Sequence, residues 1–178
     1  HGRRENDAEH AWHMALMAYL LREYANEPVD IARVMLMCLL HDVVEIDAGD
    51  TYAYDEAAKE SQAAREAAAA ERIFGLLPED QASEFRALFA EFDAGESADV
   101  RFARAMDNLQ PLLLNDSNDG GDWKEHAVTA SQVYGRQCRT SLGSAELFRV
   151  TDEILQRHIA AGHIRSEAEE GGSASGNA

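Results

Sequence analysis

The sequence contains no long apolar run, although 46% of its 178 residues are hydrophobic. No run approaches the roughly 20 residues that a membrane-spanning helix requires, so we expect no membrane partner. The first residues, from His1 to Asp7, are polar and charged, and we therefore also expect no signal peptide. A chain of this length is expected to form one domain with a core of useful size.

Cysteine and basic residues are both scarce. The two cysteines, Cys38 and Cys138, form no close pair, and this usage fits a reducing cytosol, so we expect a cytoplasmic protein. The chain has 33 acidic against 16 basic residues and a net charge of -17, which argues against a surface for nucleic acid or anionic membrane. This charge does not exclude a small phosphorylated substrate, because such a substrate needs only a local cation or a metal ion.

Strand patterns and internal repeats are also absent, and the helical period of apolar residues dominates. Asp7 or Asn6 is expected to cap the first helix and Asp30 the second, while Pro111 is expected to kink the fifth. The predicted helices cover approximately residues 8–26, 31–44, 55–75, 78–92, 97–115, 123–139 and 144–161. The fold class is therefore predicted to be all-α, a bundle of about seven helices around one core.

These helices define the expected domain organisation. Residues 1–165 are predicted to form the single helical domain, with residues 46–54 as an internal loop. Residues 166–178 are small and polar, and are predicted to form a flexible tail.

One stretch combines a buried helix with polar chemistry. The apolar run from Leu36 to Leu40 ends in adjacent His41 and Asp42, and Glu45 follows one helical turn after His41. Burial of these polar groups without a partner would cost several kcal/mol, on the usual order of such penalties. A metal ion would compensate that cost; the alternative is a helix C-terminus whose polar groups face water.

Two further polar residues interrupt apolar helical faces. His10 lies early in the first predicted helix, and Asp107 lies in the middle of the fifth. Each has a structural alternative: a hydrogen bond from His10 to a backbone carbonyl, and a salt bridge from Asp107 to Arg101 or Arg104.

Taken jointly, these positions suggest a metal site without thiolate. Two histidines and two aspartates from three helices would provide mixed nitrogen and oxygen ligands. Such ligands suit a divalent ion such as Mn, Co, Fe, Zn or Mg. A water molecule bound to the ion would be acidified and would become a nucleophile.

The same residues carry a resemblance to a known family. The ordered set H…HD…D resembles the signature of the HD-domain metal-dependent phosphohydrolases. The segments Glu5–His13, His41–Thr51 and Ala105–Pro111 look like the branch that contains the bacterial 5'-deoxynucleotidases, and the resemblance covers roughly residues 3–135. The resemblance implies an HD-domain-like fold, one divalent metal ion and a homodimer.

The resemblance also implies roles for individual residues. Glu45 would act as general acid or base or would position the attacking water, and Asp50 would orient water or protonate the leaving 5'-oxygen. Alternatively, both carboxylates would only orient His41 or another ligand. The residues implied as metal ligands are His10, His41, Asp42 and Asp107.

A phosphorylated substrate requires cations as well. Arg3 and Arg4 are candidates because arginine binds phosphate through two parallel hydrogen bonds, and Lys59 and Arg65 are weaker ones. The deoxynucleotidases that the chain resembles use an arginine in a helix upstream, whereas this sequence begins nine residues before His10. Either the chain is truncated or the phosphate and the sugar are held by other residues.

The leading functional prediction is a metal-dependent phosphomonoesterase that removes the 5'-phosphate of a (deoxy)nucleoside monophosphate. A second hypothesis is a hydrolase of cyclic nucleotides or nucleoside triphosphates that uses the same metal centre. A third is a non-catalytic helical module that is stapled by the metal. The presence of both Glu45 and Asp50 argues against the third, since a structural metal needs neither.

Overall fold

The structure is a computed structural model that describes residue 3 and residues 5–49 and 56–166. These ranges contain helices and turns but no strand, and their one β-bridge joins Thr129 and Arg165. The helices are α1 (Asp7–Leu21), η1 (Arg22–Tyr24), α2 (Ile31–Leu40), α3 (Glu45–Ala48), α4 (Glu56–Phe74), α5 (Glu79–Ala94), α6 (Ala98–Ser117), α7 (Gly121–Glu125), α8 (Ala130–Gln137), α9 (Thr140–Gly143) and α10 (Ala145–Ala160). The predicted all-α class is confirmed.

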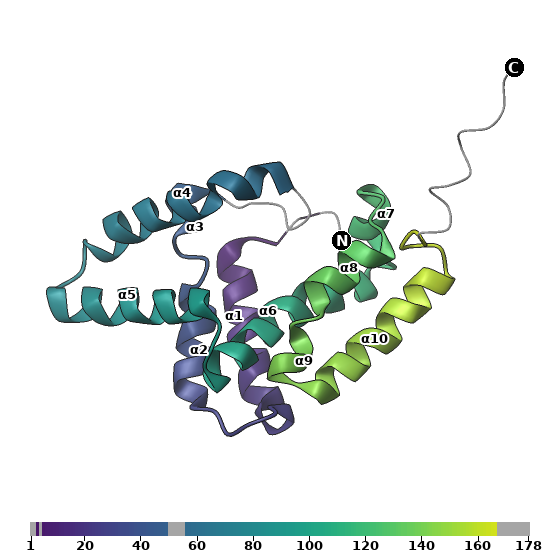
Figure 1. Ribbon diagram of the computed structural model, residues 1–178, viewed down its shortest axis with the longest axis horizontal. Coiled ribbons are helices and arrows are strands. Elements are labelled where there is room, and N and C mark those ends of the chain that lie inside the picture. Colours follow the sequence, from purple (N-terminus) through teal and green to yellow (C-terminus); the bar gives the residue numbers. More distant parts are fainter. Residues whose placement is uncertain (1–2, 4, 50–55, 167–178) are drawn as a thin grey trace, which may run out of the picture.

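Helix α6 lies at the centre of the molecule and packs against α1, α2 and α9 (Figure 1). Its residue Phe102 is fully buried, as are Met14 of α1 and Met37 of α2, so three helices share one core. Helices α4 and α5 extend side by side from one flank of α6, while α8 and α10 lie on the other flank (Figure 1). Because the elements on both flanks face α6, its central residues are in position to form a site between them.

Side-chain caps fix where the two histidine-bearing helices begin. The Asn6 side chain accepts a hydrogen bond from the backbone N–H of Glu9 at 3.1 Å, and the Glu9 carboxylate accepts one from the Asn6 N–H at 3.3 Å. Asp30 caps α2 by accepting from the N–H groups of Ala32 and Arg33. Such caps stabilise a helix by about 1 kcal/mol each, and here they fix the register of His10 and His41.

The second helix ends earlier than predicted. The prediction of a helix to residue 44 is wrong, because α2 ends at Leu40 and a turn carries the chain to α3, inside the predicted loop. In the turn, the Val43 N–H donates to the Leu40 carbonyl and the Glu45 N–H to the Asp42 carbonyl, the tighter i to i+3 pattern. Val44 is buried in a second apolar cluster with residues of α4, which explains why the chain turns away.

The predicted helix over residues 123–139 is also interrupted. The chain leaves α7 at Glu125 and starts α8 only at Ala130. Ala127 has a φ of 55°, in the left-handed region that cannot continue a helix. Thr129 then caps α8 through a reciprocal pair of hydrogen bonds with Gln132. Helix α6, in contrast, continues through Pro111 to Ser117.

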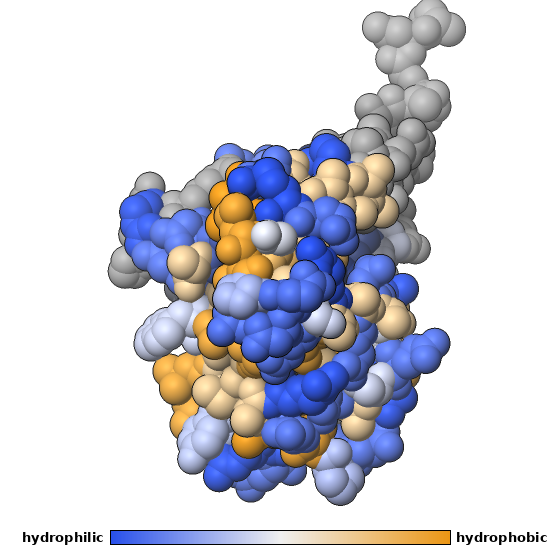
Figure 2. Space-filling view, turned by 90° about the vertical axis from the view of Figure 1, so that its left-hand side faces the viewer, coloured by the Kyte–Doolittle hydropathy of each residue, from blue (hydrophilic) through white to orange (hydrophobic). Residues whose placement is uncertain are grey.

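One end of the molecule is largely hydrophilic in its described residues (Figure 2). Figure 2 shows the end of the molecule formed by α4 and α5, where hydrophilic residues surround smaller apolar areas. None of the helices in the described ranges combines the length and the apolar character that a membrane crossing requires. The predicted tail lies outside the described residues from residue 167 onward.

Candidate metal centre and cavity

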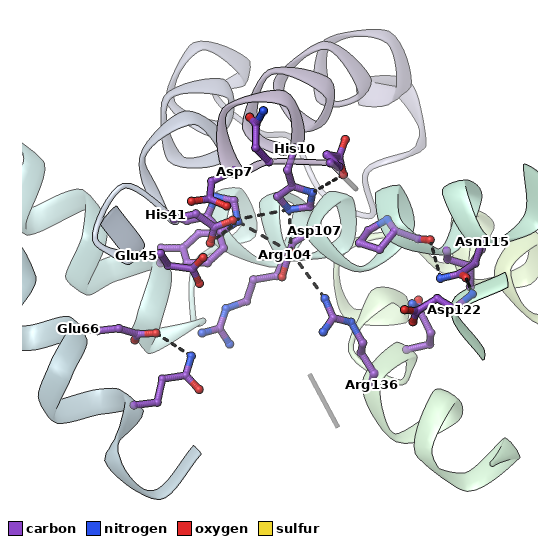
Figure 3. Close-up of a pocket in the computed structure, with 18 of the residues that line it drawn as sticks. Asp7, His10, His41, Glu45, Glu66, Arg104, Asp107, Asn115, Asp122 and Arg136 are labelled. Carbon is purple, nitrogen blue, oxygen red and sulfur yellow. Dashed lines mark hydrogen bonds and ion pairs between the residues drawn. The ribbon is translucent and has the colours of Figure 1, made fainter. Parts of the chain in front are cut away.

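Three side chains from three helices converge beside the middle of α6. His10 comes from α1, His41 directly follows α2, and Asp107 comes from α6 (Figure 3). Their potential ligand atoms all lie within 4.8 Å of one another. The Asp107 Oδ1 atom lies 3.4 Å from His10 Nε2 and 3.9 Å from His41 Nε2. Three of the four predicted metal ligands therefore meet at one point.

Asp42 lies beside this group without joining its closest cluster. Its Oδ1 atom is 3.0 Å from His41 Nε2, and its Oδ2 atom is 3.8 Å from His10 Nε2. Each oxygen thus faces a different imidazole. The structure brings all four predicted residues together, with Asp42 at the edge of the three that converge.

The His41 ring is oriented so that one nitrogen faces the centre. Its Nδ1–H donates to the Cys38 carbonyl at 2.9 Å, since a carbonyl can only accept. In the neutral ring, the Nε2 atom therefore carries a lone pair that faces the Asp42 Oδ1 atom at 3.0 Å, one acceptor against another, so this buried atom has no hydrogen bond. A buried polar atom left in this state costs about 1–3 kcal/mol. A cation at the centre would satisfy it, so the side chains present fit a metal ion.

The charges at the centre point the same way. Burial lowers the pKa of His41, but the carboxylates of Asp42 and Asp107 raise it to about 9. Burial raises the pKa of Asp107, but His10, His41 and Arg136 hold it well below its usual range. The Asp107 carboxylate therefore stays ionised beside two imidazoles, and in the absence of a metal ion His41 retains a proton.

A buried glutamine supports His10 from behind. Gln110 is 0% exposed, and its Oε1 atom accepts a hydrogen bond from the His10 Nδ1–H over 2.9 Å. The Gln110 amide donates to the Glu5 carboxylate at 2.7 Å and 2.9 Å and lies 3.0 Å from His13 Nδ1. These contacts leave His10 Nε2 directed at Asp107.

Sequence reasoning did not assign a role to Gln110. The only signal in the sequence is its position three residues after Asp107, which places both on one face of α6. Its partner Glu5 is 105 residues away in the chain.

The centre opens into a cavity of about 460 Å³. Glu45, at the start of α3, lines this cavity, as do residues from α4, α5, α7 and α8. An apolar part of the wall comes from Phe89, Phe92, Pro111, Leu112, Trp123 and Val133, and an amide part from Asn115, Gln62 and Gln137. This combination suits a ligand with a flat apolar portion and polar edges.

Two arginines line the cavity, and the sequence analysis assigned neither of them a functional role. Arg104 lies on α6 and Arg136 in the last turn of α8; Arg136 points towards Asp107, whereas the Arg104 guanidinium is turned away from the centre towards the Asp93 carbonyl (Figure 3). Arg104 had been considered only as a salt-bridge partner of Asp107. Instead, the ion pair of Asp107 with an arginine is to Arg136, at 3.9 Å.

The cations predicted from the sequence lie elsewhere or outside the described residues. Arg3 is exposed and donates to both carboxylate oxygens of Glu9 at 2.8 Å and 2.6 Å, and it is not among the residues that line the cavity. Arg65 donates to the Ala48 carbonyl. Three predicted residues are not described, at least in their side chains: Arg4, Asp50 and Lys59.

Comparison with known proteins agrees with this geometry. The model of the HD domain family matches residues 1–147. The chain is 31% identical to the human 5'-deoxynucleotidase HDDC2 over 111 residues, which are 62% of this chain and 53% of that protein. It is 30% identical to the mouse protein of the same name over 109 residues, 61% of this chain and 53% of the relative. The chain thus spans about half the length of the curated relatives that it matches.

A solved structure resembles the whole helical domain. It is the crystal structure of a predicted metal-dependent phosphohydrolase from Magnetospirillum magnetotacticum, which is 51% identical to this chain. The TM-score is 0.88, and the match covers 92% of this chain and 82% of the other.

Proposed function

The chain belongs to the HD-domain family, and we propose that it is a metal-dependent hydrolase that removes the 5'-phosphate of (deoxy)nucleoside monophosphates. The observation that carries this proposal is the convergence of His10, His41 and Asp107, with the buried His41 Nε2 directed at the centre. The similarity to 5'-deoxynucleotidases supports a nucleotide as the substrate.

We propose that one divalent ion is held by His10, His41, Asp42 and Asp107; Asp42 already lies beside both imidazoles, at 3.0 Å and 3.8 Å from their Nε2 atoms. Nitrogen and carboxylate ligands suit Mn, Co, Fe, Zn or Mg. Such an ion, when bound, acidifies a water molecule and polarises the phosphoryl oxygen.

The other residues of the cavity would complete the reaction. Glu45 lines the cavity at the start of α3, four residues after His41, where its carboxylate can accept a proton from the attacking water or orient that water. Asp50, which lies outside the described residues, is proposed to orient water or to protonate the leaving 5'-oxygen. The apolar wall that includes Pro111 and Trp123 offers a surface on which a nucleobase can pack.

The proposal is tested by pairing metal analysis with a single substitution. Purified protein is loaded with Mn²⁺ or Co²⁺ and screened for phosphate release from a panel of nucleoside monophosphates, triphosphates and cyclic nucleotides. We expect release from monophosphates, loss of at least about 100-fold in Glu45→Gln, as for a general base, and unchanged metal content. Glu79→Gln, at an exposed position of α5, is the matched control.

Each other outcome identifies what is wrong. Cleavage of triphosphates or cyclic nucleotides alone would favour the second hypothesis on the same centre. Metal binding without any hydrolysis would favour a metal-stapled module. Full activity in Glu45→Gln would remove Glu45 from the reaction.

We also propose that the protein acts as a homodimer in the cytoplasm. One face of α1 exposes large apolar side chains, including Trp12 at 64% and Leu20 at 61% exposed, with Leu16 between them at helical spacing. A contiguous apolar face of this kind is typical of an interface. Analytical ultracentrifugation is expected to give a dimer for the wild type and a monomer for Leu20→Glu; a monomeric wild type would contradict the proposal.

A further inference from the structure

The described walls of the cavity are strongly acidic. Eight carboxylates line it, against two permanent cations, Arg104 and Arg136. The carboxylates are those of Glu5, Asp7, Asp42, Glu45, Glu66, Asp93, Asp107 and Asp122. A phosphomonoester carries up to two negative charges, so it would be repelled from most of this surface. Among the described residues, favourable charge contacts are confined to the candidate metal centre and to the neighbourhood of the two arginines.

Arg136 lies directly beside the metal centre. Its Nη2 atom is 3.9 Å from Asp107 Oδ1, the same oxygen that lies within 4 Å of both imidazole Nε2 atoms. The guanidinium group and the two histidines therefore surround one point from opposite elements, α8 on one side and α1 and α2 on the other (Figure 3). A phosphate group that contacts an ion at the centre would be within reach of Arg136.

Arg136 also has donors to offer. A separation of 3.9 Å is too long for a hydrogen bond, so this ion pair leaves the N–H donors of the Arg136 guanidinium group available. Its side chain is 30% exposed, which places it at the wall of the cavity rather than in the core. The planar guanidinium group has five N–H donors arranged to bind two oxygens of a phosphate at once.

Arg104, in contrast to Arg136, is held by contacts within the protein. Its Nη2 atom donates to the Asp93 carbonyl at 2.9 Å, and its guanidinium carbon lies 5.4 Å from the centre of the Phe92 ring. It also packs tightly against the turn at Gly95, where an added Cβ would lie 2.9 Å from Arg104 Nη1. These contacts tie the end of α5 to α6 and leave fewer donors for a ligand.

We infer that Arg136 binds the phosphate group of the substrate from the α8 side of the cavity. The inference rests on the proposed function to the extent that the ligand is a phosphate ester, and it names the residue that recognises that group. In this role Arg136 supplies the charge that the exposed Arg3 does not bring to the cavity.

The test measures binding of inorganic phosphate to the Mn²⁺-loaded protein by calorimetry. Arg136→Gln is compared with Arg139→Gln, which removes the same charge from an exposed position three residues along the chain. We expect phosphate binding to weaken about 10- to 100-fold in Arg136→Gln, the range for a lost charge-assisted contact, and to be unchanged in Arg139→Gln. Arg136→Lys keeps the charge but loses the paired N–H donors of the guanidinium group, so its phosphate affinity should lie between those of the wild type and Arg136→Gln.

Mn²⁺ affinity is measured on each variant without phosphate. It should not fall in Arg136→Gln, because this substitution removes a positive charge beside Asp107 that would repel the ion. If Mn²⁺ affinity falls together with phosphate affinity, Arg136 acts by positioning Asp107 and the inference is wrong. It is equally wrong if the wild type binds no phosphate, or if neither Arg136 variant weakens binding.

These results separate the inference from the proposed function. Phosphate binding that depends on Arg136 in a protein that cleaves no nucleoside monophosphate would leave the inference standing and replace the substrate. If the protein cleaves nucleoside monophosphates but the Arg136→Gln and Arg139→Gln variants bind phosphate equally well, the proposed function stands and the inference about Arg136 is wrong.

Discussion

Replacement of Gln110 by leucine tests whether the metal centre depends on a group that is not a ligand. The substitution keeps a similar volume but removes both the acceptor for His10 Nδ1–H and the donor to Glu5. Glu5 is exposed and can be hydrated again, whereas His10 is half-buried and its Nδ1–H loses its hydrogen-bond acceptor, since the Glu5 Oε2 atom is 3.7 Å away. The loss should cost about 1–3 kcal/mol at His10, the penalty for an unsatisfied buried donor.

This cost should appear in metal binding. Removal of a group that orients a ligating histidine typically weakens metal affinity about 10- to 100-fold. Mn²⁺ affinity is measured by competition with a fluorescent chelator, with Gln156→Leu, at an exposed position of α10, as the control. Gln110→Leu should weaken Mn²⁺ binding within that range, and the control should not.

An exchange variant separates orientation from packing. Gln110→Glu alone places two carboxylates at the position of a 2.7 Å hydrogen bond, so it should destabilise the protein. Glu5→Gln combined with Gln110→Glu restores one donor and one acceptor across that contact, and it should recover most of the lost Mn²⁺ affinity. Wild-type affinity in Gln110→Leu, or no recovery in the exchange variant, would refute the reasoning.

Three further predictions concern stability. Burial lowers the pKa of His41, but the neighbouring carboxylates outweigh burial and raise this pKa from 6.5 to about 9. The proton on His41 therefore stabilises the metal-free protein fully below pH 6.5, and this stabilisation is lost as the pH rises through about 9. Thermal melting of chelator-treated protein should therefore show a Tm that falls over this interval, and a larger Tm at pH 9.5 than at pH 6.5 would contradict it. Gly143→Ala should destabilise the protein severely, because the new Cβ would lie 2.2 Å from the Arg101 carbonyl oxygen. Gly135→Ala, in α8 with nothing within 4 Å of the added Cβ, should instead stabilise it by about 0.5–1 kcal/mol in chemical denaturation.

The helices were predictable from the sequence because their signals are local. Asn6, Asp30 and Ser97 each precede a run of apolar residues at helical spacing, and each caps its helix in the structure. The interruptions were not predictable, since they depend on distant contacts. Val44 is buried against residues of α4, and the break before α8 accompanies a bridge from Thr129 to Arg165, 36 residues further along the chain.

The centre of the site was predictable for a different reason. His10, His41 and Asp107 stand out because each places a polar group on an apolar helical face, and the structure brings them within 4.8 Å. Gln110 and Arg136 carry no such mark. An amide after an aspartate and an arginine in a polar helix are common, and only the packing of α1 and α8 against α6 shows what they contact.

The point at which the prediction of helix α2 failed is the point at which the site is built. The turn after Leu40 permits the His41 Nδ1–H to donate back to the Cys38 carbonyl, so that Nε2 faces the centre. The same turn places Asp42 between both imidazoles and starts α3 at Glu45, which lines the cavity. A continuous helix would point Asp42 about 100° away from His41, on a different face. Local helix preference is overridden here because the buried Val44 packs against α4, and the resulting turn lets two neighbouring residues face the same centre.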